Sequence, residues 1–213
     1  GIEHSNRKRS NQDICFPMAY IKEDISDEKK SDSYLFWEKY GVLQNDKVLN
    51  VVFLGTFTKS FEFETIFSAA KILQDQDAKV RFIFCGIGAK EEKVRQLCKK
   101  LNNCIFAGWI NTSQIKVILE LSDVGLAPYI QVKNFSENIP NKPAEYLSEN
   151  LLIATSLEKG KLCELINSRD CGLSYGRDAQ KLASFLENLS VNDAERAKLA
   201  KNAENVFSNE LDG

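Results

Sequence analysis

Acidic and basic side chains gather around one predicted helix start in the second half of the chain. Glu137 lies in a polar loop, Glu145 lies on the predicted helix with seven residues between the two, and Lys142 stands at the helix start itself. A carboxylate on the first turns of a helix can accept both hydroxyls of a ribose. A carboxylate in the preceding loop can face a sugar ring or the positive charge that develops on it. This stretch is therefore the first place to look for function.

The helix start follows a predicted buried strand, and that position matters. Residues 123–129 are short, apolar and closed by Pro128, as a buried parallel strand should be. Pro143 fits a first helical turn, where the missing N–H of proline costs nothing. A helix that begins just beyond such a strand directs its free N–H groups and the positive end of its dipole into the ligand crevice.

Glycines follow three other predicted strands and are expected at the same crevice. Gly55, Gly86 and Gly108 each close a strand, where they would let the backbone approach a ligand. The alternative is that they only form tight strand-to-helix turns. Lys59, in the first of these turns, can bring positive charge to a phosphate, as Lys142 can. The pair Gly86-x-Gly88 lacks the third glycine of the dinucleotide fingerprint, which argues against a nicotinamide cofactor.

Hydrophobic periodicity predicts the elements that position these residues. Predicted buried strands cover residues 47–55, 80–85, 104–107, 123–129, 151–155 and 172–175. Predicted helices cover residues 32–40, 62–73, 91–101, 112–121, 141 onward, 159–167, a segment around 182–189, and 193–207. The alternation predicts an α/β fold, a doubly wound parallel sheet of about six strands covered on both faces.

Composition limits the function classes. The 213 residues, 43% apolar and 27% charged, suit one soluble domain with an extra segment, and the net charge of −2 gives no reason to expect nucleic acid. The basic run at residues 7–9 is interpreted as a solvated linker, with contact to an anionic membrane as the alternative. No apolar run approaches the roughly 20 residues of a membrane span, so neither a membrane-spanning helix nor a signal peptide is expected from this sequence.

Cysteine and histidine usage argues against several chemistries. The six cysteines form no Cys-x-x-Cys pair and lie mostly in apolar contexts, which indicates buried free thiols in a reducing cytosol. His4 is the only histidine, so histidine-based acid–base or nucleophilic chemistry is not expected. Asp75 and Asp77 form an Asp-x-Asp, but they are predicted at the sheet edge opposite the crevice. No metal site is therefore expected.

Several motifs occur in a fixed order from about Tyr34 to the end of the chain. They are Trp37-Glu-Lys-Tyr-Gly-Val, Phe84-Cys-Gly-Ile-Gly, Ile105-Phe-Ala-Gly-Trp-Ile, Ser122-Asp-Val-Gly-Leu-Ala-Pro and Ile139-Pro-Asn-Lys-Pro-Ala-Glu-Tyr-Leu. Together they resemble the C-terminal, donor-binding domain of GT-B-fold retaining glycosyltransferases of the "glycosyl transferases group 1" family. The last motif resembles members that build bacterial surface polysaccharides.

The resemblance implies a role for each candidate residue. Glu145 would hold the nucleotide ribose, and Glu137, the catalytic candidate, would contact the donor sugar's hydroxyls. The backbone of Ile110 would meet the base, and backbone amides near Asn141 and Lys142 would hold the diphosphate. The expected donor-binding set is Glu145, Gly55, Thr56, Lys59, Gly86, Ile110, Asn138, Ile139, Asn141 and Lys142. Transfer would proceed with retention, without a metal or cofactor, from a nucleoside-diphosphate sugar.

The chain departs from the family pattern at the phosphate site. The family usually has an arginine directly after the first strand's glycine and a lysine five residues further on, both on the diphosphate. Those positions are Thr56 and Phe61 here. Lys59 or Lys142 would have to substitute, and an inactive member is the alternative. Trp109 could stack on the base, but packing under a neighbouring helix is the favoured interpretation.

The prediction is one half of a GT-B fold. Residues 1–47 are expected to be an inter-domain junction with a short helix, and residues 48–213 a Rossmann-like nucleotide-sugar-binding domain. Because the chain begins with Gly1, we expect an excised fragment that is inactive alone and whose glycan or lipid-linked acceptor binds a missing N-terminal domain. The expected location is cytoplasmic, with peripheral contact at the inner face of the plasma membrane left open for the full-length protein.

Two rival functions remain at this point. A sugar-nucleotide epimerase shares the two-domain fold but needs acid–base residues that this half does not offer. A non-catalytic, flavodoxin-like interaction module would explain the missing arginine. It would bind no nucleotide and would carry a phosphoacceptor aspartate at the end of the first strand, where Gly55 stands.

Overall fold

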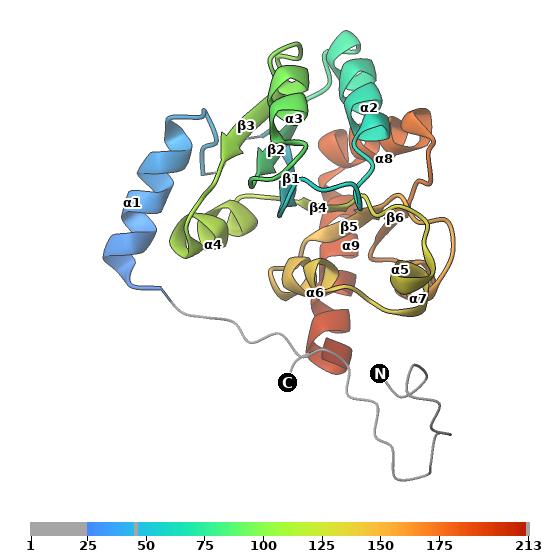
Figure 1. Cartoon of the computed structure of the whole chain (residues 1–213). Helices are drawn as coiled ribbons and strands as arrows, with labels where there is room; N and C mark the ends of the chain where they lie inside the picture. Colours follow the sequence, from blue (N-terminus) through green and yellow to red (C-terminus); the bar gives the residue numbers. More distant parts are fainter. Residues whose placement is uncertain (1–24, 45–46, 212–213) are drawn as a thin grey trace.

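A parallel sheet forms the centre of the fold in the computed structural model, which describes residues 25–44 and 47–211 (Figure 1). Its six strands run in the order β3-β2-β1-β4-β5-β6, and every neighbouring pair is parallel. The strands are β1 (Leu49–Leu54), β2 (Val80–Cys85), β3 (Cys104–Gly108), β4 (Val124–Ala127), β5 (Leu152–Thr155) and β6 (Gly172–Ser174). The reversal of strand order between β1 and β4 is that of a doubly wound, Rossmann-like sheet.

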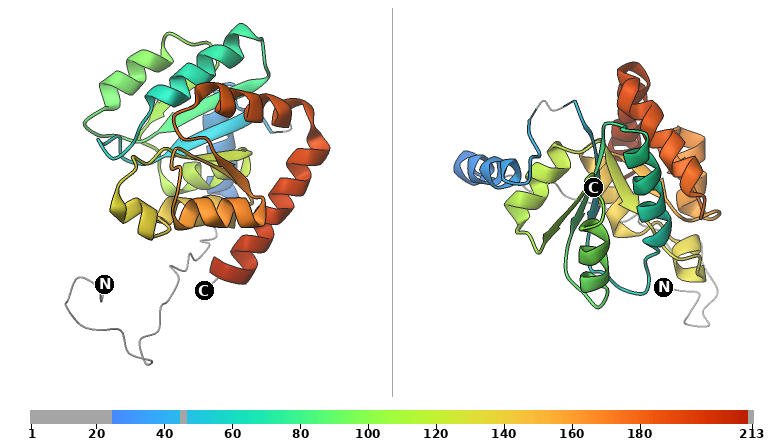
Figure 2. Two further views of the ribbon diagram at one scale, coloured as in Figure 1. Left: turned by 90° about the vertical axis from the view of Figure 1, so that its right-hand side faces the viewer. Right: turned by 90° about the horizontal axis from the view of Figure 1, so that it is seen from above.

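Helices cover both faces of this sheet. They are α1 (Asp27–Glu38), α2 (Glu64–Asp75), α3 (Glu91–Cys98), α4 (Thr112–Glu120), α5 (Lys133–Glu137), α6 (Asn141–Ser148), α7 (Lys161–Arg169), α8 (Ala179–Val191) and α9 (Asp193–Val206), which continues as a π-helix, η2 (Phe207–Leu211). α1 packs on α4 and α2 packs on α8. Figure 2 shows these two pairs on opposite sides of the sheet, so the fold has three layers.

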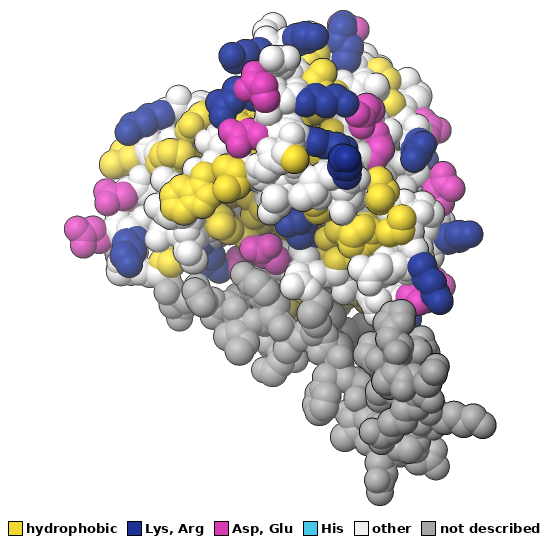
Figure 3. Space-filling model, in the orientation of Figure 1, with side chains coloured by type: hydrophobic (Ala, Val, Ile, Leu, Met, Phe, Trp, Pro, Cys, Tyr) yellow, Lys and Arg dark blue, Asp and Glu magenta, His cyan; other side chains and the backbone are white. Residues whose placement is uncertain are grey.

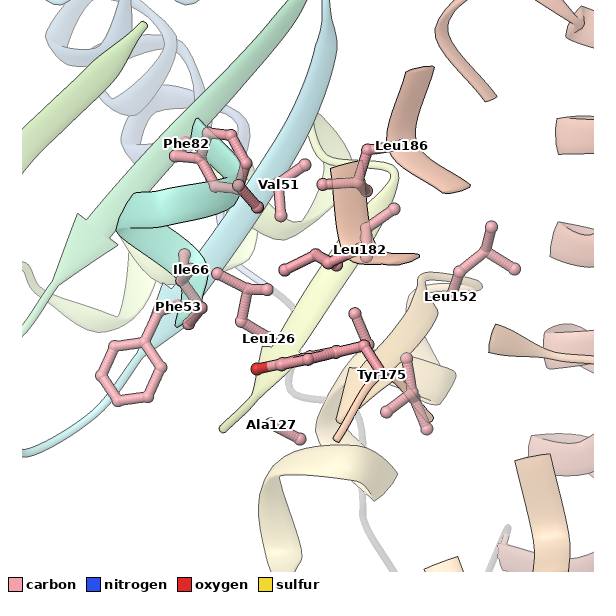
Figure 4. Close-up of a cluster of buried hydrophobic side chains, with 14 of the residues drawn as sticks. Val51, Phe53, Ile66, Phe82, Leu126, Ala127, Leu152, Tyr175, Leu182 and Leu186 are labelled. Atoms are coloured by element: carbon pink, nitrogen blue, oxygen red, sulfur yellow. The ribbon is translucent and has the colours of Figure 1, made fainter. Parts of the chain in front are cut away.

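The alternating side chains of β1 divide the core into two parts. Val51 and Phe53 point into the larger cluster, together with residues of α2, β2 and α8 (Figure 4). Val52 and Leu54 point into the smaller cluster, where they meet Trp37 of α1 and residues of α4. Because β1 is buried over its whole length, its two faces anchor both helical layers. The position of the loop that follows β1 is therefore fixed by the core.

A tyrosine of α6 fills the point where strand order reverses. β1 and β4 pair only at Val51–Val124 and Val52–Gly125. Beyond that point the Tyr146 hydroxyl accepts from the Leu54 amide and donates to the Leu126 carbonyl, both at 3.2 Å. Gly125 makes room, because a Cβ there would lie 2.2 Å from the Tyr146 ring. The buried hydroxyl thus satisfies two backbone groups that the strands leave unpaired, and it fixes α6 against the sheet.

The predicted elements agree with the structure apart from their ends and one helix. All six strands are confirmed. The first helix begins at Asp27 rather than at residue 32, because Asp27 and Glu28 favour a helix amino end although apolar spacing is visible only further on. The expected polar loop after β4 contains the short helix α5, which has no buried residue and therefore no apolar periodicity.

Some sequence predictions are not tested by this structure. The basic run at residues 7–9, the apolar patch at 14–20, His4 and Cys15 lie outside the described residues. The division of the chain at residue 47 stays a prediction. Five cysteines are described, all of them free thiols, and only Cys104 among these is more than slightly exposed.

Candidate functional site

A pocket of about 500 Å³ opens at the carboxyl ends of β1 and β4. The loop after β1 forms one wall with Thr58, Ser60 and Phe61, and the amino end of α6 forms the opposite wall. Its remaining lining residues, including those of α5, are Tyr129, Asn134, Phe135, Asn138, Ile139, Pro140, Asn141 and Lys142. We call this the switch-point pocket, because such sheets bind ligands where the strand order reverses.

Lys142 brings a half-buried positive charge to the switch-point pocket. Its Nζ atom lies against Gly55, only 2.1 Å from where a Cβ on that glycine would be, and 5.7 Å and 5.9 Å from the ring centres of Phe53 and Phe61. Among the described residues it has neither a hydrogen-bond acceptor nor an ion-pair partner. Burial lowers the pKa of Lys142, and the Glu145 carboxylate only partly opposes that shift. The ammonium group is therefore held where an anion would stabilise it.

Glu145 lies one helical turn beyond Lys142 and shows the opposite shift. Burial raises the pKa of its carboxyl group, and the Lys142 charge pulls the pKa back down. Glu145 also raises the pKa of the Tyr129 hydroxyl, although burial of the tyrosine is the larger cause. No hydrogen bond to its carboxylate is formed within the described part of the chain. Glu145 itself does not line the switch-point pocket, although it interacts with Lys142 and Tyr129, which do, and its expected role stays a prediction.

The glycines after β1 and β2 are needed for close backbone packing. Gly55 and Gly86 have φ angles of 145° and 141°, which other residues rarely adopt. A Cβ on Gly86 would lie 1.8 Å from the Gly55 carbonyl oxygen, so the two turns touch each other directly. Gly55 additionally makes room for Lys142. Gly86 therefore forms a tight turn against Gly55, and the contact of either glycine with a ligand stays a prediction.

Glu137 ends α5 and is exposed to solvent. Its carboxylate pairs with Lys133 at 3.5 Å, and its side chain is 52% exposed. It does not line the switch-point pocket, whereas its neighbour Asn138 does. The structure thus places the two glutamates of the expected pair in different surroundings on either side of the α5–α6 turn.

The other predicted site residues are scattered around the strand ends. Thr56 and Lys59 are exposed in the loop after β1, and neither lines the pocket. Ile110 is 6% exposed and packs into the smaller core cluster at the end of β3. Trp109 corrects a prediction, because it is 69% exposed rather than packed under a helix. The turn after β3 points its aromatic ring outward while Ile110 fills the core.

Sequence reasoning missed several residues that shape the site. Phe61, Tyr129 and Phe135 form an aromatic wall, with ring centres of Tyr129 at 5.2 Å from Phe61 and 4.6 Å from Phe135. Tyr146 was also missed. The available signal was Gly125, because a glycine inside a buried strand marks the close approach of another group.

The described residues show no patch of a single charge on the viewed face and no cluster of metal-ligating side chains. Figure 3 shows Lys and Arg interspersed with Asp and Glu over the viewed face. Residues 25–44 and 47–211 contain no group of three or more His, Cys, Asp or Glu that could hold a metal ion. None of the described helices is long and apolar enough to span a bilayer.

Comparisons with known proteins agree on the family and the fold. The sequence model described as "Glycosyl transferases group 1" matches residues 38–206. A search of curated proteins found no match. Among solved structures, WaaG, a glycosyltransferase involved in lipopolysaccharide biosynthesis, is similar with a TM-score of 0.67 and 18% identity. The similarity covers 91% of this chain and 51% of WaaG.

Two further solved structures extend this similarity. Anabaena Alr3699/HepE in complex with UDP and glucose gives a TM-score of 0.66 at 16% identity, over 85% of this chain and 48% of HepE. A TM-score of 0.63 at 16% identity is found for the C-terminal domain of LpcC, a group 1 glycosyl transferase family protein from Francisella tularensis. That match covers 84% of this chain and 93% of the LpcC domain. The chain thus spans about half the length of WaaG and HepE.

Proposed function

The chain belongs to the glycosyl transferases group 1 family, and from that premise we propose that it forms the nucleotide-sugar-binding half of a glycosyltransferase. The switch-point pocket would take a nucleoside-diphosphate sugar. The glycan or lipid-linked acceptor would bind the other half of the enzyme, since the chain spans about half of WaaG and HepE. Alone, the chain is expected to bind the donor and to transfer no sugar.

Lys142 is the observation that carries this proposal. Its ammonium group is half-buried, lines the pocket and lacks an acceptor in the described part of the chain. A diphosphate would supply anionic oxygens to it and would gain the free N–H groups at the amino end of α6. Binding would therefore relieve the desolvation of Lys142 as well as form new contacts.

The same lysine compensates for the departure from the family pattern. Phe61, in the place of the usual lysine, is 8% exposed and lies beside the Lys142 ammonium. Thr56 and Lys59 are exposed and do not line the pocket. In this proposal the positive charge comes from α6 instead of from the loop after β1. Lys142 is thus a better substitute than Lys59.

The proposed reaction transfers the sugar with retention and without a covalent intermediate. The bond between the sugar C1 and the diphosphate oxygen breaks while an acceptor oxygen bonds to C1 from the same face. The acceptor's proton passes to the leaving phosphate oxygen. Lys142 and the amino end of α6 would stabilise the charge that builds on the diphosphate, in place of a metal ion. Glu145 would hold the ribose, and Glu137 would contact the donor sugar's hydroxyls.

The proposed substrate class is bacterial surface polysaccharide. WaaG is involved in lipopolysaccharide biosynthesis, and the Ile139 to Leu147 motif supports the same class. Nucleoside-diphosphate sugars are cytoplasmic metabolites, so we place the enzyme in the cytoplasm. The full-length protein would reach lipid-linked acceptors by peripheral contact with the inner face of the membrane.

Calorimetric titration with a panel of nucleoside diphosphates and their sugars tests the proposal. We expect one nucleotide series to bind, and the Glu145→Ala variant to bind it about tenfold or more weakly. Lys201→Ala is the control, because Lys201 lies on α9 in an exposed ion pair with Glu204. If the folded chain bound no nucleotide of the panel, the proposal would be overturned and a non-catalytic interaction module would be favoured.

A further inference from the structure

A second pocket, separate from the switch-point pocket, lies at the carboxyl ends of β4, β5 and β6. It has a volume of about 320 Å³. Four loops contribute to it, because its lining residues are Glu62, Tyr129, Ile130, Gln131, Ser156, Glu158 and Arg177. We call it the β4–β6 pocket. Tyr129 lines this pocket and the switch-point pocket, so the two share one wall.

The Glu62 Oε2 atom is buried at the β4–β6 pocket and has no hydrogen-bond partner in the described part of the chain. The buried hydroxyl of Tyr175 lies near Glu62 and Ser156, although Tyr175 itself does not line this pocket. Tyr175 is 2% exposed, and Figure 4 shows its side chain reaching from the end of β6 toward Leu126 of β4. Burial raises the pKa of the Tyr175 hydroxyl, and the Glu62 carboxylate adds to the rise. A buried polar atom without a partner costs free energy, so the Glu62 Oε2 atom would gain from a ligand that donates a hydrogen bond to it.

Charged groups at the mouth of this pocket also lack partners. Glu158 and Arg177 both line it, and both line the adjoining pocket of about 390 Å³ around Ser174 to Lys181. Neither side chain forms a hydrogen bond or an ion pair within residues 25–44 and 47–211. Glu62, by contrast, uses its Oε1 atom to accept from the Thr65 amide at 2.9 Å, which caps α2. Only its second oxygen is available to a ligand.

The mixture of groups selects the chemistry of that ligand. Two carboxylates, those of Glu62 and Glu158, and one guanidinium line the pocket, so a phosphate would meet more repulsion than attraction. Carboxylates accept hydrogen bonds from the hydroxyls of a ligand, and the Arg177 guanidinium can donate to those hydroxyls. The volume lies at the small end of ligand pockets, which suits a ligand the size of one sugar ring.

We propose that the β4–β6 pocket binds one neutral saccharide unit other than the sugar of the donor. The choice of a saccharide rests on the proposed function, in which the acceptor is a glycan. The shared wall at Tyr129 would place this unit beside the donor, so the pocket would hold part of an acceptor glycan on the donor-binding half.

Amide-resolved NMR titration of the whole chain tests this proposal. The probes are methyl glycosides of neutral hexoses and N-acetylhexosamines, added with a saturating nucleoside diphosphate and then with the nucleotide sugar. We expect at least one glycoside to shift the amides of Ser156, Glu158 and Arg177 under both conditions. A glycoside displaced by the nucleotide sugar would overturn the proposal, because the pocket would then hold the donor's own sugar.

Variants connect the binding to the pocket. Glu62→Gln keeps the Oε1 acceptor that caps α2 and changes only the unpartnered atom. Glu62→Gln and Arg177→Ala should each weaken glycoside binding about tenfold and leave nucleotide affinity unchanged. Lys201→Ala should change neither. Unaltered glycoside affinity in both pocket variants would contradict the proposal.

Failure of this inference is distinguishable from failure of the proposed function. If the nucleotide binds and no glycoside shifts the pocket amides, the β4–β6 pocket holds water only and the inference is wrong. If glycosides bind and no nucleotide does, the saccharide pocket stands and the proposed donor site is wrong.

Discussion

Two lysine–glutamate pairs flank the switch-point pocket and differ in their surroundings. Lys133 and Glu137 on α5 are 80% and 52% exposed and form an ion pair at 3.5 Å. Lys142 and Glu145 on α6 are half-buried and form no direct bond with each other. On α5 the two charges satisfy each other in water. On α6 burial disfavours both charges, and their mutual attraction only partly compensates.

The difference follows from how each helix is attached. α5 has five residues and buries none of them, so its charges stay in solvent. α6 buries Pro143, Ala144, Tyr146, Leu147 and Ser148, and Tyr146 fixes it to β1 and β4. A well-packed helix can hold unpaired charges in a fixed position, which is what ligand binding requires. We therefore expect α6 to determine nucleotide affinity and α5 to adjust the fit of the sugar.

Replacing the buried lysine should produce the largest effect. Lys142→Met keeps the volume of the side chain and removes the charge, so nucleoside-diphosphate affinity should fall about 100-fold. The free energy of unfolding at neutral pH should rise by about 1 kcal/mol, because an unpaired buried charge is lost. Calorimetry and urea denaturation measure the two effects.

The pH dependence of stability gives this prediction a second readout. Because burial lowers the pKa of Lys142 below 10.5, the unfolded chain binds more protons in the window below 10.5. Wild-type stability should therefore rise with pH through that window, and the rise should be absent in Lys142→Met. If Lys142→Met bound nucleotide as tightly as wild type does, α6 would contribute no more to nucleotide affinity than α5.

The glycine beneath the lysine should be the next most sensitive position. A Cβ on Gly55 would lie 2.1 Å from Lys142 Nζ, at a φ angle of 145°. Gly55→Ala should lower the free energy of unfolding by about 2 kcal/mol and move the ammonium group, so nucleotide affinity should fall about tenfold. Thr56→Ala, at the exposed neighbouring position, is the matched control. Equal effects of both variants would contradict the link between Gly55 and Lys142.

Neutralising Glu145 should weaken nucleotide binding by a similar factor, but it should change the pH dependence of stability in a different pH range. Glu145→Gln should lower nucleotide affinity about tenfold if the carboxylate accepts the ribose hydroxyls. Burial raises its pKa above 4.5, so the folded chain binds more protons above that pH and wild-type stability falls there as pH rises. Denaturation between pH 4 and pH 7 should show this fall in wild type and a smaller one in the variant.

The sequence predicted the strands and the start of α6 because these depend on local patterns. Apolar runs bounded by glycine, and a proline near a helix start, identify β2 and α6 without any tertiary information. The burial of Lys142 was not predictable, since it depends on Gly55 and Phe61, which are far away in the sequence. Trp109 shows the same limit, because whether β3 ends with its aromatic ring inward or outward is decided by Ile110 and the neighbouring core.

The smallest effect is expected on α5. Glu137→Gln removes an exposed ion pair, so the free energy of unfolding should change by less than about 0.5 kcal/mol. Nucleoside-diphosphate affinity should stay within about twofold of wild type, because Glu137 does not line the pocket.

The nucleotide sugar should bind wild type more tightly than the nucleoside diphosphate does, because only the sugar would displace Lys133 from the Glu137 carboxylate. Glu137→Gln should lower this affinity advantage, the ratio of the two affinities, several-fold. Lys133→Ala, which frees Glu137, should leave that advantage intact. If Glu137→Gln lowered diphosphate and nucleotide-sugar affinity equally, the division of roles between α5 and α6 would be wrong.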